Sequence, residues 1–171
     1  MKYILKVICI LSVSVLFCGC EKLAMDRRET VMFENNAKYG IYVYSMLMPL
    51  YYDNSENNVF YPDTSLPNVV PNQIEYINKM SSKDIVSTSS GILHIFSRFG
   101  VDTISIFVFS ADTIEDAMYW SDIRDSYNIL QRYDVSPKDL GYLSFPPTEE
   151  MRNIKMWPPY GTYNDDGFRI E

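Results

Sequence analysis

The most continuous apolar segment after the N-terminus covers residues 103–110. Its large apolar residues divide between the two faces of an extended chain, with Ile104, Ile106 and Val108 on one face and Phe107 and Phe109 on the other. A strand that is apolar on both faces needs a covering layer on each side. The pattern therefore predicts a buried central strand over 103–110, around which the remaining elements are arranged.

The next segment has helical periodicity. Its apolar residues recur every three to four positions, at Ile114, Ala117, Met118, Ile123, Tyr127 and Leu130. Asp112 is a good N-cap residue, and Glu115 three positions later completes a pattern like a capping box. We predict a helix over 113–132, with its weakest point near 121–122, packed against the strand.

Shorter apolar runs predict two hairpins. Residues 30–34 and 41–47 are rich in β-branched and aromatic residues, and a turn over 35–40 would join them. Residues 91–97 and 103–110 form the second expected pair.

The other segments are shorter or more polar. The hydroxyl-rich stretch 81–90 predicts an exposed loop. Ser136 followed by Pro137 predicts the start of a short helix that Gly141 ends, and 142–145 predicts a last strand. The segment 161–171 is a polar C-terminal tail that we expect to fray.

These elements predict an α+β fold, with an antiparallel sheet and one main helix packed on it. A β-sandwich with a peripheral helix is the alternative. One globular domain over 30–160 accounts for them. The composition agrees, because 47% of the 171 residues are apolar and 15% are aromatic, enough for a packed core.

The charge balance argues against nucleic-acid binding. The formal net charge is −7 and the sequence pI is about 4.7. A phosphate-binding surface needs clustered Lys and Arg, and no such cluster follows residue 28.

The N-terminus has the physical features of a signal peptide. Lys2 and Lys6 precede an uncharged apolar run over 7–17, shorter than the roughly 20 residues that span a bilayer. The sequence Phe17-Cys18-Gly19-Cys20 that closes it resembles the lipobox of bacterial lipoproteins. The whole chain resembles small lipoproteins of Gram-negative gut anaerobes, more loosely in the segments 61–67, 128–134 and 157–160.

This resemblance implies a location but no mechanism. It implies removal of a signal peptide over 1–19, acylation of Cys20, and a lipidated tether over 20–29. The expected partner is the membrane, reached through the acylated Cys20, and the expected location is the cell envelope. The segment 21–24 lacks an acidic cluster, which favours the periplasmic face of the outer membrane over its surface.

No sequence motif carries recognisable chemistry. His94 is the single histidine, and its alternation with apolar neighbours favours a surface or hydrogen-bonded side chain over a general base. Asp102 and Asp112 fit a turn and a helix cap, and residues 164–167 fit a turn better than a calcium loop. We therefore predict no catalytic residue, no metal site and no cofactor.

The aromatic residues are the candidate binding residues. Five of them could form a ligand platform for a glycan or a protein segment: Tyr51, Tyr52, Tyr61, Trp157 and Tyr160. Tyr42 and Tyr44 are further candidates, and packing inside the protein is the favoured alternative for the whole set. The sequence thus predicts a non-enzymatic, membrane-anchored binding or accessory protein. A carboxylate-dependent hydrolase and a structural assembly subunit remain open as alternatives.

Overall fold

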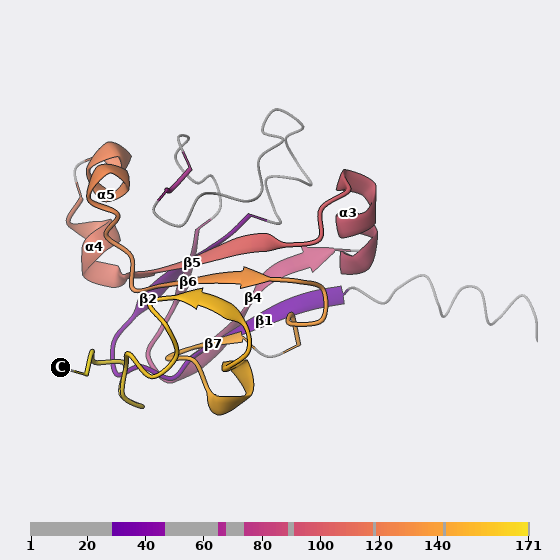
Figure 1. Ribbon diagram of the computed structural model, residues 1–171. Coiled ribbons are helices and arrows are strands. Elements are labelled where there is room, and N and C mark those ends of the chain that lie inside the picture. Colours follow the sequence, from indigo (N-terminus) through magenta and orange to yellow (C-terminus); the bar gives the residue numbers. More distant parts are fainter. Residues whose placement is uncertain are drawn as a thin grey trace, which may run out of the picture.

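Figure 1 shows the computed structural model of this protein. The described residues are 29–46, 65–67, 74–88, 91–117, 119–141 and 143–170. They form two β-sheets and a few short helices, which confirms the predicted α+β class.

The larger sheet has five strands and is antiparallel throughout. Its order is β3 (Glu75–Ile77), β2 (Ile41–Ser45), β5 (Ile104–Ser110), β6 (Gln131–Val135) and β8 (Lys155–Trp157). The predicted central strand is confirmed, because β5 lies in the middle and its first six residues are buried. Apolar residues on both faces suit a strand with cover on each side.

The smaller sheet has three strands, in the order β4 (Ser81–Thr88), β1 (Glu29–Asn35) and β7 (Leu143–Phe145). β1 pairs with β4 antiparallel and with β7 parallel. The prediction of an exposed loop over 81–90 is wrong for 81–88, because the buried Ile85, Val86 and Thr88 anchor a strand there. The prediction of a strand at 142–145 is confirmed by β7. It is not the last strand, because β8 follows it along the chain.

The first predicted hairpin is wrong, because β1 and β2 belong to different sheets. The buried side chain of Asn35 stabilises the crossing between them. Its Nδ2 donates to the carbonyl oxygens of Tyr39, Ile77 and Asn78, and its Oδ1 accepts from the amide of Ala37. These bonds replace the ladder of a hairpin with contacts to the turn and to the end of β3.

The second predicted hairpin is also wrong, because residues 92–99 are the helix α3 (Ile92–Phe99). Ile92, Ile95 and Phe96 are buried at helical spacing, and Leu93 points outward with 65% of its surface exposed. Gly100 ends the helix in the left-handed conformation at φ 64°, which glycine adopts at little cost.

The predicted helix over 113–132 is wrong. Two short helices, α4 (Ala111–Glu115) and α5 (Trp120–Ser126), stand in its place, and its last two residues already belong to β6. Ser110 caps α4 in place of Asp112, since its Oγ accepts from the Thr113 amide at 3.1 Å. Tyr127 ends α5 at φ 50°, after which β6 pairs with both β5 and β8. Pairing on both edges satisfies the backbone of 131–135 better than a solvent-exposed helix end would.

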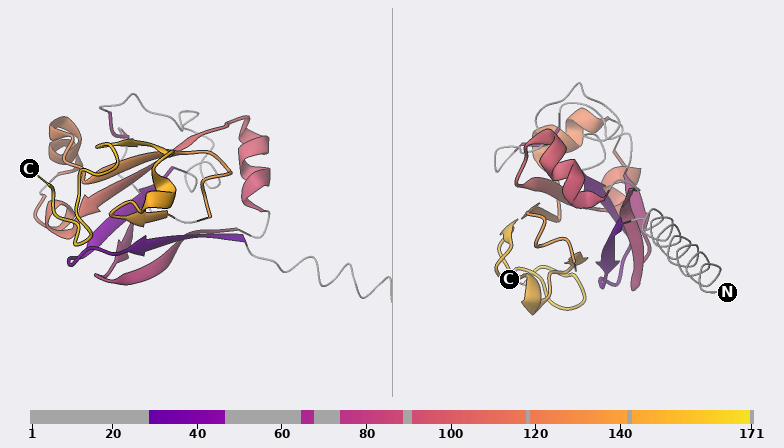
Figure 2. Two further views of the ribbon diagram at one scale, coloured as in Figure 1. Left: turned by 60° about the horizontal axis from the view of Figure 1, so that its bottom comes forward. Right: turned by 90° about the vertical axis from the view of Figure 1, so that its right-hand side faces the viewer.

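The main core lies between the two sheets. Val31, Phe33, Leu143 and Phe145 of the smaller sheet share one buried cluster with the apolar residues of the larger sheet, among them Ile41, Val43, Ile104, Ile106, Val108, Tyr133 and Val135. A second buried cluster lies on the other side of the larger sheet and includes Tyr44, Leu66, Phe107, Phe109 and Ile123. Figures 1 and 2 show α4 and α5 near one end of β5 and α3 near the other.

The C-terminal segment packs on the body, so the expectation of fraying is wrong for 161–170. The 3-10 helix η1 (Glu149–Met151) leads into β8, and the chain then returns to the turn after β1. There the Tyr39 hydroxyl donates to the Gly167 carbonyl at 2.6 Å, and the Lys38 amide donates to the Asp166 carbonyl at 3.0 Å. Gly167 is required at this contact, because a Cβ atom there would lie 2.6 Å from the Ala37 Cβ.

The predicted helix beginning at Ser136 is a turn over 137–141. Both the amide and the hydroxyl of Ser136 donate to Asp139 Oδ2, so the capping interaction exists without a helix behind it. Among the described helices, none has the length and the apolar run that a membrane crossing requires.

Candidate binding face

Six side chains on neighbouring strands of the larger sheet point away from the smaller sheet. We call them the outer face: Ser105, Phe107, Arg132, Asp134, Lys155 and Trp157. In the strand register Arg132 lies opposite both Phe107 and Trp157, and Asp134 lies opposite both Ser105 and Lys155. Directly opposed residues share a face of the sheet, so the register alone brings these groups together.

The charged part of the outer face is a buried ion-pair network. Arg132 is only 1% exposed, and its Nε lies 2.8 Å from Asp134 Oδ1. Ser105 joins them, because its Oγ donates to Asp134 Oδ1 at 3.0 Å and accepts from Arg132 Nη2 at 3.2 Å. Lys155 Nζ lies 3.2 Å from Asp134 Oδ2. Charges can be buried at this position because each is paired and hydrogen-bonded.

An aromatic part adjoins the network. The guanidinium of Arg132 lies 5.6 Å from the centre of the Phe107 ring, within the range of a cation–π contact. The Phe107 ring stacks on Tyr44 at 6.4 Å, and Phe109 contacts Trp120 of α5 at 5.9 Å. The charged network of the outer face therefore adjoins an aromatic cluster that Phe107 forms with Tyr44, Phe109 and Trp120.

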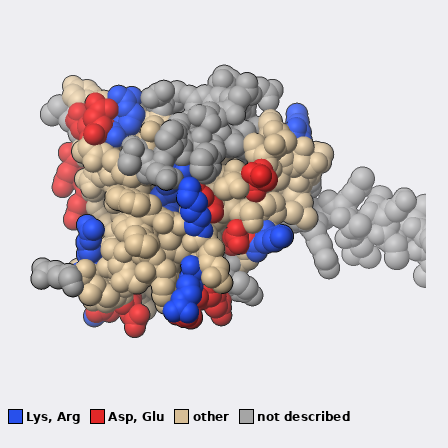
Figure 3. Space-filling model, viewed as in Figure 1, with Lys and Arg blue, Asp and Glu red and all other residues tan. Residues whose placement is uncertain are grey.

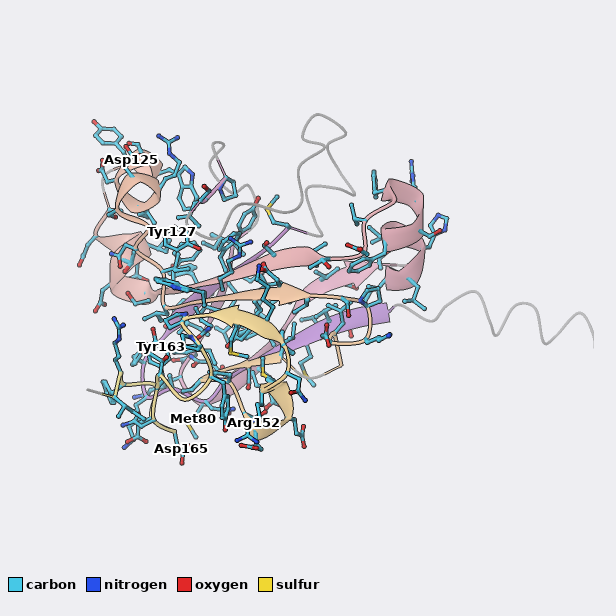
Figure 4. All side chains as sticks on the ribbon, in the orientation of Figure 1. Met80, Asp125, Tyr127, Arg152, Tyr163 and Asp165 are labelled. Atoms are coloured by element: carbon cyan, nitrogen blue, oxygen red, sulfur yellow. The ribbon has the colours of Figure 1, made fainter. Side chains whose placement is uncertain are left out.

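The solvent-accessible border of this face is at β8, an edge strand of the sheet. Trp157 is 44% exposed, and its ring lies 5.4 Å from that of Tyr127. Tyr127, labelled in Figure 4, is the residue that ends α5. The Lys155 side chain is 58% exposed. An aromatic surface beside an ammonium group can hold the apolar face of a ring while donating a hydrogen bond to an acceptor on its rim.

The predicted platform residues do not all meet here. Trp157 belongs to the outer face, whereas the Tyr160 hydroxyl donates to Glu149 Oε2 at 2.9 Å and its ring lies under the Arg152 guanidinium at 5.8 Å. The hydrogen bond to Glu149 raises the pKa of Tyr160 above its ordinary value. Tyr51, Tyr52 and Tyr61 lie outside the described residues, as does Cys20.

The two further tyrosine candidates have packing roles. Tyr44 is buried against Phe107. The Tyr42 ring contacts Tyr76 at 5.1 Å, and its hydroxyl donates to Glu115 at 3.3 Å. Burial and Glu115 raise the pKa of Tyr42.

Sequence reasoning missed Arg132, Asp134, Lys155 and Tyr127 as site residues. The interpretation of 113–132 as one helix hid the alternation Gln-Arg-Tyr-Asp-Val, which is the period of a strand. That alternation was the available signal, because it places Arg132 and Asp134 on one face and Tyr133 on the other.

A small cavity of about 80 Å³ lies on the smaller sheet. Its lining combines two carboxylates with apolar and hydroxyl groups: Met32, Glu34, Gly141, Leu143, Ser144, Thr148 and Glu150. His94 is exposed on α3. The segment 164–167 is a turn, in which Asn164 Oδ1 accepts from the amides of Asp166 and Phe168. Within the described part of the chain, no group of three or more His, Cys, Asp or Glu side chains could hold a metal ion.

The surface charge is dispersed. On the face shown in Figure 3, the Lys and Arg side chains of the described residues form separate patches among acidic ones, and the largest continuous area is uncharged. No protein-family model, no curated protein and no solved structure matches this chain.

Proposed function

We propose that this chain is a lipoprotein of the cell envelope, anchored in the outer membrane by an acylated Cys20, with a non-enzymatic binding or accessory role. The proposed anchor is based on the sequence Phe17-Cys18-Gly19-Cys20, which directly follows an apolar run of signal-peptide length. The start of the first described strand is consistent with it, because β1 begins at Glu29, nine residues after Cys20. The first described strand therefore follows the proposed attachment point closely in sequence.

Acylation would be sufficient to hold the protein. Each buried methylene contributes about 0.8 kcal/mol, so two or three acyl chains give an anchor that rarely dissociates. No described helix is required for attachment.

The binding role is proposed for the border of the outer face. Trp157 and Tyr127 offer aromatic surface, and Lys155 offers a cation next to them. The buried Arg132–Asp134 pair of β6 lies next to them, and it is joined to β5 through Ser105 and to β8 through Lys155. This combination supports a glycan or peptide ligand, whose rings or apolar side chains would pack on Trp157.

The anchor is tested by metabolic labelling with an alkyne analogue of palmitate. We expect label on the wild-type protein and on the matched control Cys18→Ser, and none on Cys20→Ser. Mass spectrometry of the mature N-terminus should then place the acyl groups on residue 20. Intact, unacylated precursor as the stable species in soluble extract would contradict the proposal.

The binding role is tested by titrating glycan fragments and peptides of the envelope into the purified protein. For any ligand that binds, Trp157→Ala should weaken affinity about tenfold, because truncation of an aromatic anchor typically costs more than 1 kcal/mol. Tyr160→Ala is the matched control, because that ring has different partners and should leave affinity unchanged. Equal losses for both variants would exclude the outer face as the contact.

The hydrolase alternative has one specific observation in its favour, the cavity lined by Glu34 and Glu150. A glycosidase mechanism needs two carboxyl groups about 5–9.5 Å apart, one acid and one base or nucleophile. If the chain hydrolyses a glycan, Glu34→Gln and Glu150→Gln should each abolish turnover, and Trp157→Ala should not.

A further inference from the structure

Helix α3 lies at the same end of the body as the beginning of β1. In the strand register Glu29 is paired with Thr88, the last residue of β4. Only four residue steps separate Thr88 from Ile92, the first residue of α3, a distance of at most about 14 Å. Figures 1 and 2 both show α3 next to the start of β1.

The length of chain before β1 limits how far this end can be from an anchor. Nine residue steps separate Cys20 from Glu29 and cannot span more than about 32 Å. If Cys20 is acylated, the start of β1 therefore stays within that distance of the lipid surface, and α3 lies next to it. The other end of the strands lies about 23 Å from the start of β1, because that is the length of the eight residues of β4.

The outward side of α3 has a composition suited to a lipid surface. Leu93 is 65% exposed, and His94, Ser97 and Arg98 are exposed beside it, whereas Ile92, Ile95 and Phe96 are buried in the core. α3 contains no carboxylate, in a chain whose net charge is −7. The next acidic residue along the chain is the exposed Asp102, in the loop before β5.

We propose that the outward side of α3, with Leu93 and Arg98, rests on the phospholipid surface that holds the acylated Cys20. Leu93 enters the interface, and Arg98, whose guanidinium carbon lies 5.5 Å from the centre of the Phe99 ring, places its charge among anionic head groups. The proposal rests on the anchor of the proposed function. A weak contact is sufficient, because the tether provides an effective concentration on the order of millimolar. In this orientation α3 faces the membrane and the turn between β3 and β4 points away from it.

The chain offers a way to test this geometry without cellular acylation. Residues 20–171 retain every described residue, and Cys20 is their single cysteine. Cys20 can therefore be coupled to a maleimide lipid in vesicles of phosphatidylcholine and phosphatidylglycerol that contain brominated lipid. Brominated acyl chains quench only tryptophans that reach the bilayer.

The probe is Leu93→Trp, and the matched control is Met80→Trp in the turn between β3 and β4. Met80 is similarly exposed, at 69%, and lies at the opposite end of β4 (Figure 4). Relative to the background of Trp120 and Trp157, we expect several-fold more quenching for Leu93→Trp than for Met80→Trp. Arg98→Glu added to Leu93→Trp should reduce that quenching on vesicles with phosphatidylglycerol and leave it unchanged on phosphatidylcholine alone. Thermal melts of each variant establish that the fold is retained.

Equal quenching of the two probes, or no quenching of either, would overturn the contact of α3 with the membrane. The acylation experiment fails independently. If labelling shows no acyl group on Cys20 while coupled Leu93→Trp is still quenched, the anchor is wrong but α3 has an affinity for lipid. If Cys20 is acylated and the probes do not differ, the anchor is correct and the orientation is wrong.

Discussion

The two faces of the five-stranded sheet are built from alternate residues of the same strands. Both faces are buried, but different interactions stabilise the buried groups on each. On the inner face Ile104, Ile106 and Val108 are inaccessible and meet the smaller sheet through apolar contact. On the outer face Phe107 and Arg132 are almost equally buried, but Arg132 requires Asp134 and Ser105 as partners. The inner face is stabilised by apolar area, whereas the outer face depends on complete pairing of charges.

Equal burial does not give the two faces equal tolerance to substitution. Removing methylene groups from an apolar face loses transfer free energy and leaves a cavity. Removing one member of a buried ion pair leaves the other charge without compensation in a medium of low polarity. We therefore expect the largest single loss of stability on the face that carries the candidate site.

Asp134→Ala should have the largest effect. It removes the carboxylate that pairs with both Arg132 and Lys155, and we expect a loss of about 3–5 kcal/mol in the free energy of unfolding. Urea denaturation followed by circular dichroism measures it. The control is Asp125→Ala, whose ion pair with Arg124 is exposed and contributes about 0–1 kcal/mol. Similar losses in the two variants would mean that the network is not a buried one.

Ile106→Ala tests the inner face. We expect a loss of about 2–5 kcal/mol, because the side chain is inaccessible and lies between the two sheets. The same urea titration applies, and Ile114→Ala, a partly buried site on α4, should lose less. If Ile106→Ala cost less than Ile114→Ala, the main core would not lie between the sheets.

Tyr133→Phe tests the polar link between the two sheets. The Tyr133 hydroxyl on β6 donates to the Ser144 carbonyl on β7 at 2.6 Å, and both residues are buried. Removal of the hydroxyl takes this hydrogen bond from the buried carbonyl, so we expect a loss of about 1–2 kcal/mol in the free energy of unfolding. Tyr160→Phe, which removes an exposed hydroxyl bond to Glu149, should change stability by less than about 0.5 kcal/mol.

Alkaline pH tests what the packed tyrosine side chains contribute to stability, without any substitution. Burial, and secondarily the nearby Tyr163, raises the pKa of Tyr39 to about 12, and burial raises the pKa of Tyr133 well above its ordinary value. The unfolded chain loses these protons near pH 10, so the stabilisation is complete below about pH 10 and decreases as the pH rises toward about 12. Urea midpoints at about pH 8 and about pH 11 should therefore differ, with the lower midpoint at the higher pH.

Tyr39→Phe should reduce this fall in the urea midpoint at alkaline pH, because phenylalanine has no hydroxyl proton to lose. Tyr119→Phe, at an exposed position, is the matched control and should leave the decrease as it is in the wild type. If Tyr39→Phe showed the full wild-type decrease, another group would be responsible for the alkaline sensitivity.

The sequence predicted several elements but not their pairing. β5 was predicted because a run apolar on both faces has few alternatives, and the strand character of β1, β2 and β7 was also recognised. Residues 92–99 were misjudged because a short apolar run fits a strand or a buried helix equally well. Of the candidate platform, Trp157 was identified from its residue type, but its neighbours Arg132, Asp134 and Tyr127 were not. Their roles depend on β6 lying between β5 and β8.

From its residues alone, this chain reveals its α+β class, its central strand and its acidic balance, and it supplies the hypothesis of an acylated Cys20. These properties follow from composition and from patterns within a few neighbouring residues. The division into two sheets, the crossing at Asn35 and the outer face arise only in the folded chain. The reason is that backbone and ionic partners far apart in sequence, such as Glu29 with Thr88 and Asp134 with Lys155, meet only after the core between the sheets has formed.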